Sequence, residues 1–129
     1  MPLTRISLRK GKSPAYIQAI LDGVYEATRA TFNVPENDRF QLVTQHEANE
    51  FVYGSGFLGI ERSDDLVIIQ ITAAGRTSQQ KRALYQDIAR RLTQNPGLRP
   101  EDIFISLVGV TREDWSFGHG EAQLAGTAP

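Results

Sequence analysis

The sequence contains no cysteine, only two histidines and no long apolar run. The lack of cysteine excludes disulfides, thiolate chemistry and any metal site built on cysteine. The two histidines, His46 and His119, lie far apart in the chain and form no ligand cluster. No apolar stretch approaches the roughly 20 residues that a membrane-spanning helix needs, and residues 1–12 lack the apolar segment of a secretory signal. We therefore expect a soluble, cytoplasmic protein.

An excess of charge of either sign is also missing. Lysine and arginine total 14 and aspartate and glutamate total 15, so the formal net charge is −1. No overall field then favours nucleic acid or an anionic membrane, and we expect neither as a partner. The chain has 129 residues, 40% of them hydrophobic, which is enough for a buried core. We expect a single domain over residues 1–129.

The chain begins Met1-Pro2 and passes directly into an alternating run at residues 3–8, which predicts a strand. Removal of Met1 would leave the secondary amine of Pro2 at the start of that strand. Free α-amino groups titrate at about 7.7–8.0, far below lysine, so such an amine can exchange protons near neutral pH. The alternative is that Pro2 has no chemical role, because many chains begin Met-Pro.

The rest of the pattern is a β-α-β unit that occurs twice, at about residues 1–47 and 64–110. In each unit a strand, a glycine turn, an N-capped helix with one apolar face and a second strand follow in order. A constant offset in numbering relates the two units at several positions, pairing Gly11 with Gly75, Ser13 with Thr77, Asp38 with Asp102 and Phe40 with Phe104.

A doubled β-α-β unit restricts the topology. Each crossover is expected to be right-handed, which makes the two strands of each unit parallel. We predict an α/β (α+β) fold with one four-stranded sheet, two helices on one face and short hairpins. The Gly- and aromatic-rich residues 48–60 predict a loop or short hairpin, and residues 111–129 a C-terminal hairpin that packs on a neighbouring chain. The apolar strand at 66–72 leads us to expect that other subunits cover the bare face, since each buried aliphatic side chain gains about 1.5–3 kcal/mol.

Several segments together resemble the tautomerase superfamily and, within it, the malonate semialdehyde decarboxylase family. Besides Pro2 and the doubled unit, the resemblance is carried by residues 34–40 (VPENDRF), 43–46 (VTQH), Gly75-Arg76 with Gln80-Lys81, and Asp114-Trp115-Ser116-Phe117-Gly118. The last segment is the most specific, because a tryptophan and a phenylalanine flanking serine, then glycine, rarely arise by chance. The similarity extends over nearly the whole chain.

This resemblance implies a homotrimer with the amino-terminal proline in a cleft, no metal or cofactor, and a small 2-oxo or 3-oxo acid as substrate. Carried over by position, Pro2 is the catalytic amine and Asp38 its acidic partner. Arg76 binds the substrate carboxylate and is also counted as catalytic, while Trp115 and Phe117 form an apolar, substrate-binding wall. The implied reaction is decarboxylation or hydration of malonate semialdehyde, with keto–enol tautomerisation as the broader activity.

Residue chemistry agrees with these roles but leaves alternatives open. An arginine offers a planar fork of donors that matches a carboxylate, although Arg76 can also be a solvated residue at a helix start. Asp38 can simply end its segment, as its repeat counterpart Asp102 can. The decarboxylase pattern has a second arginine two positions before Arg76, and here that position is Ala74. This departure favours the alternative of a non-catalytic trimer that binds a small acid or a partner protein.

Overall fold

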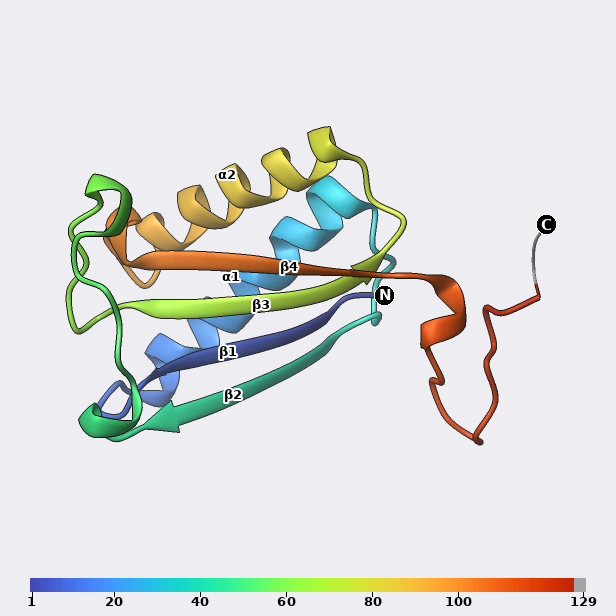
Figure 1. The fold of residues 1–129 in the computed structure, drawn as a ribbon, viewed down its shortest axis with the longest axis horizontal. Helices are drawn as coiled ribbons and strands as arrows, with labels where there is room; N and C mark the ends of the chain where they lie inside the picture. The colour runs from blue at the N-terminus through green and yellow to red at the C-terminus, as the bar shows by residue number, and fades with distance from the viewer. Residues whose placement is uncertain (127–129) are drawn as a thin grey trace.

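A computed structural model describes residues 1–126 as a four-stranded sheet with two long helices on one face (Figure 1). The elements are β1 (Leu3–Arg9), α1 (Pro14–Phe32), β2 (Phe40–His46), β3 (Val67–Ala74), α2 (Ser78–Gln94) and β4 (Ile103–Val110). The strand order is β2-β1-β3-β4, in which β1 runs parallel to β2 and β3 parallel to β4. The two units join through the antiparallel pair β1 and β3. The predicted sheet with two helices on one face is therefore confirmed.

Local sequence explains where the two helices begin. The Ser13 side chain caps α1 by accepting the backbone N–H of Tyr16, and Pro14 at the first helical position has no N–H to lose. Helix α2 begins with a capping box, in which Thr77 and Gln80 each accept the other's backbone N–H. Asn33 ends α1 in the left-handed conformation, which asparagine tolerates better than most residues.

The core lies between the helices and one face of the sheet. Alternate residues of the two central strands point toward the helices and are buried, as the period of two in a strand requires. The apolar members of this set are Ile6, Leu8, Val67, Ile69, Ile71 and Ala73. The helices contribute fully buried side chains, among them Ile20, Val24, Leu84, Ile88 and Leu92. Each such side chain contributes about 1.5–3 kcal/mol of burial free energy.

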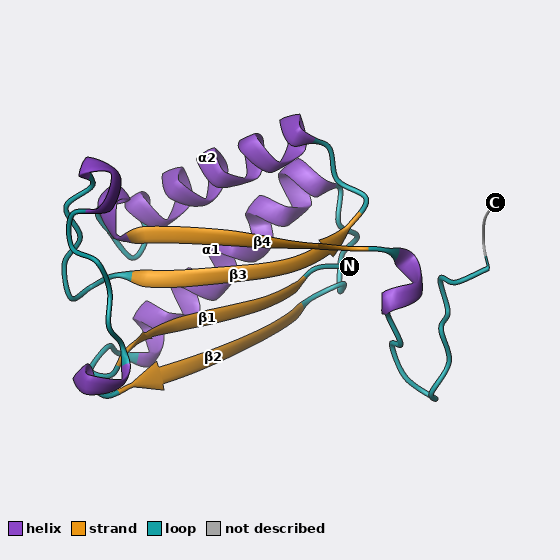
Figure 2. Cartoon of the chain, in the orientation of Figure 1, coloured by secondary structure: helices purple, strands orange, loops and turns teal. Residues whose placement is uncertain are grey.

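The opposite face of the sheet carries no helix among residues 1–126 (Figure 2). Its centre is partly polar, since Gln70 on β3 and Arg5 on β1 point to this side. The apolar side chains of β3 are therefore buried mainly against the helices and not on this face. Large apolar side chains are exposed instead on the edge strands: Phe40, Leu42, Phe104 and Val108. Cover by other subunits remains a prediction, and these edge residues now motivate it.

Residues 48–60 form a loop, which is one of the two predicted alternatives, whereas residues 111–126 do not form the predicted C-terminal hairpin. Residues 48–60 form two single 3₁₀ turns, and residues 111–126 form one 3₁₀ turn at Arg112–Asp114 and irregular chain. Positive φ angles at Gly118, His119 and Gly120 interrupt the extended conformation that strand pairing needs. The segment after β4 projects away from the sheet in Figure 1. Residues 127–129 of the predicted C-terminal hairpin lie outside the described residues.

Strand register gathers the termini of several elements at one end of the sheet. Leu3 lies opposite Phe40 on β2 and Thr72 on β3, while Ala74 at the end of β3 lies opposite Val110 at the end of β4. The amino terminus, the turn before β2, the Gly75-Arg76 turn and the segment after β4 therefore meet at that end. Between residues 1 and 126, no helix is long and apolar enough to cross a membrane.

Candidate active site

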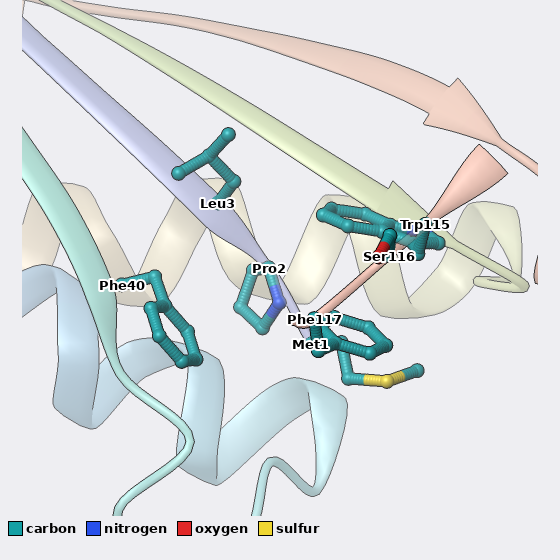
Figure 3. A pocket seen from close by; sticks show the side chains of 7 residues that line it. All are labelled: Met1, Pro2, Leu3, Phe40, Trp115, Ser116 and Phe117. Atoms are coloured by element: carbon teal, nitrogen blue, oxygen red, sulfur yellow. The ribbon is translucent and has the colours of Figure 1, made fainter. Parts of the chain in front are cut away.

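An apolar cavity of about 220 Å³ lies at this end of the sheet, and we call it the N-terminal pocket (Figure 3). It is lined by Met1, Pro2, Leu3, Phe40, Trp115, Ser116 and Phe117. Three segments thus contribute to it: the start of β1, the first residue of β2 and the chain after β4. Of the predicted site residues, Pro2, Trp115 and Phe117 line this pocket, and Asp38 and Arg76 do not.

Asp38 nevertheless reaches the amino terminus. The terminal amine of Met1 and Asp38 Oδ2 are 2.8 Å apart, and the Asp38 side chain is 14% exposed. The β1–β2 register explains this pairing, because Leu3 lies opposite Phe40 and residues 1 and 38 each stand two positions earlier. Pro2 is buried beside this ion pair. The fold therefore brings an anionic group to the point where the chain begins.

Arg76 lies immediately after β3 and is only partly exposed. Its Nη1 donates to the carbonyl oxygen of Ala74 at 2.7 Å, and its guanidinium carbon lies 4.8 Å from the centre of the Phe32 ring. Its Nε is buried and has no hydrogen-bond partner within the described chain. A buried N–H without an acceptor costs about 1–3 kcal/mol, so this donor is available to an anion that enters nearby.

The aromatic wall has a similar orphaned donor. The rings of Trp115 and Phe117 stack with centroids 5.5 Å apart and planes at 12°. Gln123 holds this segment by accepting the Phe117 backbone N–H at 2.9 Å and donating to the Gly118 carbonyl at 2.8 Å. The indole Nε1 of Trp115 is buried and finds no acceptor in residues 1–126.

Sequence reasoning missed the residues that hold the Asp38 turn. The Tyr25 hydroxyl accepts the backbone N–H of Asn37 at 3.3 Å, and the Arg39 guanidinium lies 4.5 Å from the centre of the Tyr25 ring. A comparison of the two repeat units could have found Tyr25 and Arg39, because these polar residues are replaced by Ala89 and Ile103 at the equivalent positions of the second unit. For metals, the described residues contain no group of three or more histidine or acidic side chains arranged to hold an ion.

A doubled β-α-β sheet with a buried proline directly before its first strand, a carboxylate at the chain terminus and an apolar wall is the arrangement of a tautomerase-type protein. The comparison with family models agrees, since residues 38–118 match a model described as "Tautomerase enzyme". The chain belongs to the tautomerase family, a family of enzymes.

Curated relatives carry the same family name. "Probable tautomerase YusQ" of Bacillus subtilis (strain 168) is 43% identical over 125 residues, which cover 96% of this chain and 98% of the relative. "Probable tautomerase YrdN" of the same organism is 34% identical over 124 residues, with 96% of both chains covered.

Solved structures include two malonate semialdehyde decarboxylases. One superimposes with a TM-score of 0.89 at 34% identity and 95% coverage of both chains. The other, inhibited by 3-bromopropiolate, gives a TM-score of 0.86 at 36% identity, with coverage of 94% of this chain and 92% of the other. A "fused 4-OT wild type symmetric trimer" is 21% identical with a TM-score of 0.78 and coverage of 96% and 98%, and it shares the fold. The chain is thus structurally close to malonate semialdehyde decarboxylase.

Proposed function

We propose that this chain is a cofactor-independent enzyme that performs acid/base chemistry on a small oxo acid with the amine of Pro2, after Met1 is removed. The specific activity we infer is like that of malonate semialdehyde decarboxylase, by decarboxylation or hydration, with keto–enol tautomerisation of 2-oxo acids as a second activity. The observation that supports the proposal is the position of Asp38, whose Oδ2 lies 2.8 Å from the terminal amine of Met1, one residue before the buried Pro2. In the proposed active form Met1 is absent, and we infer that the amine of Pro2 takes the place of the Met1 amine as the cation nearest Asp38.

The role of the amine follows from its neighbours. A carboxylate close to an amine favours the charged form of that amine, whereas burial favours the neutral form. If Asp38 pairs with the Pro2 amine after Met1 is removed, as it pairs with the Met1 amine in this structure, we infer that Pro2 acts in its charged form and polarises the carbonyl oxygen of the substrate. Electrons from the breaking carbon–carbon bond then flow toward that carbonyl, carbon dioxide leaves, and the resulting enolate takes a proton. In hydration, Asp38 would instead hold the attacking water.

Substrate binding is assigned to Arg76, Trp115 and Phe117. We infer that Arg76 turns its free Nε and the rest of its guanidinium toward the substrate carboxylate. The stacked Trp115 and Phe117 rings exclude water from one side of the pocket, which strengthens each charge contact there. Because Ala74 supplies only its carbonyl to Arg76, the proposed site binds the carboxylate with one arginine rather than two.

We also propose that the active form is a homotrimer. The exposed apolar side chains of the edge strands and of Phe117, which is 42% exposed, provide the surface for this assembly. The name of the fused 4-OT structure describes that protein as a symmetric trimer, in agreement with the proposal.

The test is an assay of purified protein whose intact mass establishes that Met1 is absent. Wild type and Pro2→Ala are compared with malonate semialdehyde and with the enol of phenylpyruvate as substrates. We expect wild type to turn over at least one of them and Pro2→Ala to lose at least about a hundredfold in kcat, in the range typical of an acid/base group. Pro14→Ala, a proline substitution at the start of α1, is the matched control and should retain activity.

Two results would contradict the proposal. Wild type that binds these acids without converting either one would support the non-catalytic alternative. A Pro2→Ala variant as active as wild type would exclude the proline mechanism while leaving the family assignment intact.

A further inference from the structure

We propose that Tyr25 and Arg39 are positioning residues that fix the carboxylate of Asp38 in front of the chain terminus. This inference rests on the proposed function, because it assigns these two residues a part in the same reaction. Neither side chain lines the N-terminal pocket. Both act through the turn that carries Asp38.

Tyr25 holds the turn from helix α1. Its hydroxyl accepts the backbone N–H of Asn37 at 3.3 Å, directly before Asp38 in the chain. Asn37 adopts a left-handed conformation with φ of 71°, and the backbone N–H of Asp38 donates to the Pro35 carbonyl at 3.2 Å. The hydrogen bond to Tyr25 therefore fixes the Glu36–Asn37 peptide, and through the left-handed Asn37 it restricts the backbone that leads into Asp38.

Arg39 holds the turn from the other side. Its guanidinium lies 4.5 Å from the centre of the Tyr25 ring, its Nη2 donates to Asp22 Oδ1 at 2.7 Å, and its Nε donates to Gln41 Oε1 at 2.8 Å. Gln41 in turn donates to the Leu21 carbonyl at 2.8 Å. The residues before and after Asp38 are thus both tied to helix α1.

The second repeat shows that these ties are not needed to form the turn. Asp102 is the counterpart of Asp38 there, and its backbone N–H makes the same kind of bond, to the Arg99 carbonyl at 2.9 Å. The positions equivalent to Tyr25 and Arg39 are Ala89 and Ile103, which cannot make the corresponding contacts.

Asp102 itself is fixed by direct bonds to its carboxylate, from the Ser63 backbone N–H at 2.7 Å and the Ser63 hydroxyl at 2.6 Å. The ion pair described for Asp38 is with the chain terminus instead. A carboxylate that must stay open for chemistry has to be held through its backbone. This contrast between the repeats is the reason to assign the Tyr25–Arg39 pair a functional rather than a purely structural part.

The experiment compares Tyr25→Phe and Arg39→Gln with Arg29→Gln. The Arg29 guanidinium lies 5.9 Å from the centre of the same Tyr25 ring, but in the described chain it donates no hydrogen bond to the turn, so it is the matched control. Misplacement of a catalytic group by about 1 Å can cost about a hundredfold in rate. We expect kcat to fall roughly tenfold to a hundredfold in the first two variants, with little change in KM and no change in Arg29→Gln.

The pH dependence supplies a readout that a purely structural role would not change. When the anion beside the amine moves away, the charged amine is less favoured, so the limb of the kcat profile set by the amine should move to lower pH. Unchanged kcat and pH profile in both variants, or a loss of thermal stability alone, would overturn the inference.

A readout independent of turnover separates this inference from the proposed function. The position of the Asp38 carboxylate, determined by crystallography, should shift away from the chain terminus in Tyr25→Phe and Arg39→Gln but not in wild type or Arg29→Gln. If wild type is inactive but this difference appears, the positioning role stands and the proposed reaction fails. An Asp38 carboxylate in the same position in all four proteins would reject the positioning role.

Discussion

The two ends of the sheet are built from equivalent residues and differ in what they can do chemically. A second cavity, of about 480 Å³, lies at the end opposite the N-terminal pocket, and we call it the far pocket. It is lined by Val52, Tyr53, Gly54, Phe57, Arg62, Leu66, Ile68 and Phe104. In each pocket a register pair forms the floor, Leu3 with Phe40 in one and Ile68 with Phe104 in the other.

The walls also correspond. Phe51-Val52-Tyr53-Gly54 and Trp115-Ser116-Phe117-Gly118 occupy equivalent positions of the repeat, and each segment follows a 3₁₀ turn with a capping box. The two pockets differ in the backbone that lines them. The N-terminal pocket is lined by the first residues of the sequence, whereas Leu66 at the far pocket lies within the chain. The duplicated unit thus supplies the frame twice, and the proposed amine chemistry uses only the copy that contains Pro2.

The carboxylates show the same difference. Asp38 is 14% exposed and pairs with the terminus, whereas the Asp102 side chain is fully buried, accepts two hydrogen bonds from Ser63 and lies 3.5 Å from Arg99 Nη1. The two aspartates at equivalent positions therefore differ: Asp38 pairs with the chain terminus, whereas Asp102 is buried and holds its own turn. Substitutions at the two sites should separate activity from stability.

The largest effect is expected for Asp38→Asn at the N-terminal end. The amide keeps the size of the side chain but removes the charge that faces the amine, so kcat should fall about a thousandfold. The free energy of unfolding, measured by chemical denaturation, should change by less than about 1 kcal/mol because the pair is partly exposed. An active Asp38→Asn enzyme would mean that Asp38 only ends its turn, as Asp102 does.

The reverse result is expected for Asp102→Asn at the far end. An asparagine amide has only one acceptor oxygen, so it cannot accept from both Ser63 groups, and the charge-assisted bonds to Ser63 and the pairing with Arg99 are lost. We expect the free energy of unfolding to drop by about 3 kcal/mol while kcat of the folded fraction is retained. Glu101→Gln, at a partly exposed neighbour whose carboxylate pairs with Arg99, is the control; it should change the free energy of unfolding by less than about 1 kcal/mol and leave kcat unchanged. A stable but inactive Asp102→Asn variant would contradict the division between the two ends.

The aromatic walls should differ in substrate binding. Phe117→Ala removes part of the apolar wall of the N-terminal pocket, and we expect KM to rise about tenfold, equivalent to about 1.4 kcal/mol of lost binding. Tyr53→Ala, at the equivalent position of the repeat, removes the matching wall of the far pocket and should leave KM unchanged. Steady-state kinetics with one substrate decides between them, and equal KM values for both variants would place substrate elsewhere.

Much of this frame could be predicted from the sequence because its signals are local or repeated. The N-caps at Ser13 and Thr77, the apolar period of each helix and the parallel pairing of a crossover are all visible without coordinates. The prediction of a C-terminal hairpin is wrong for residues 111–126, because a positive φ angle such as that at His119 depends on packing rather than on residue type.

The candidate site could be predicted only as a set of residues. The contact between Asp38 and the amino terminus depends on the β1–β2 register. The pattern of apolar residues does not determine that register to within one residue. That Arg76 would donate to its own Ala74 carbonyl, and that Tyr25 would reach Asn37 in the turn beyond its helix, depends on how side chains settle around the turn. The chemical roles of these residues remain proposals for the experiments above.

The smallest effect concerns the pH dependence of stability at the N-terminal end. The hydrogen bond from the Arg39 guanidinium holds the pKa of Asp22 below its ordinary value of 3.8. A carboxyl whose pKa is lower in the folded state stabilises the fold above its unfolded pKa, and the contribution disappears as the pH falls through the folded pKa. Asp22→Asn should therefore be less stable than wild type at pH 7 and equally stable well below pH 3.8.

The difference should stay under about 0.5 kcal/mol, because the Asp22 side chain is 53% exposed and water screens the pair. Chemical denaturation at both pH values measures it. The equivalent position in the second repeat is Gln86, so Gln86→Asn is the matched control, without a pH-dependent difference from wild type. A stability gap for Asp22→Asn that persists unchanged at low pH would show that Asp22 acts through packing and not through its charge pair with Arg39.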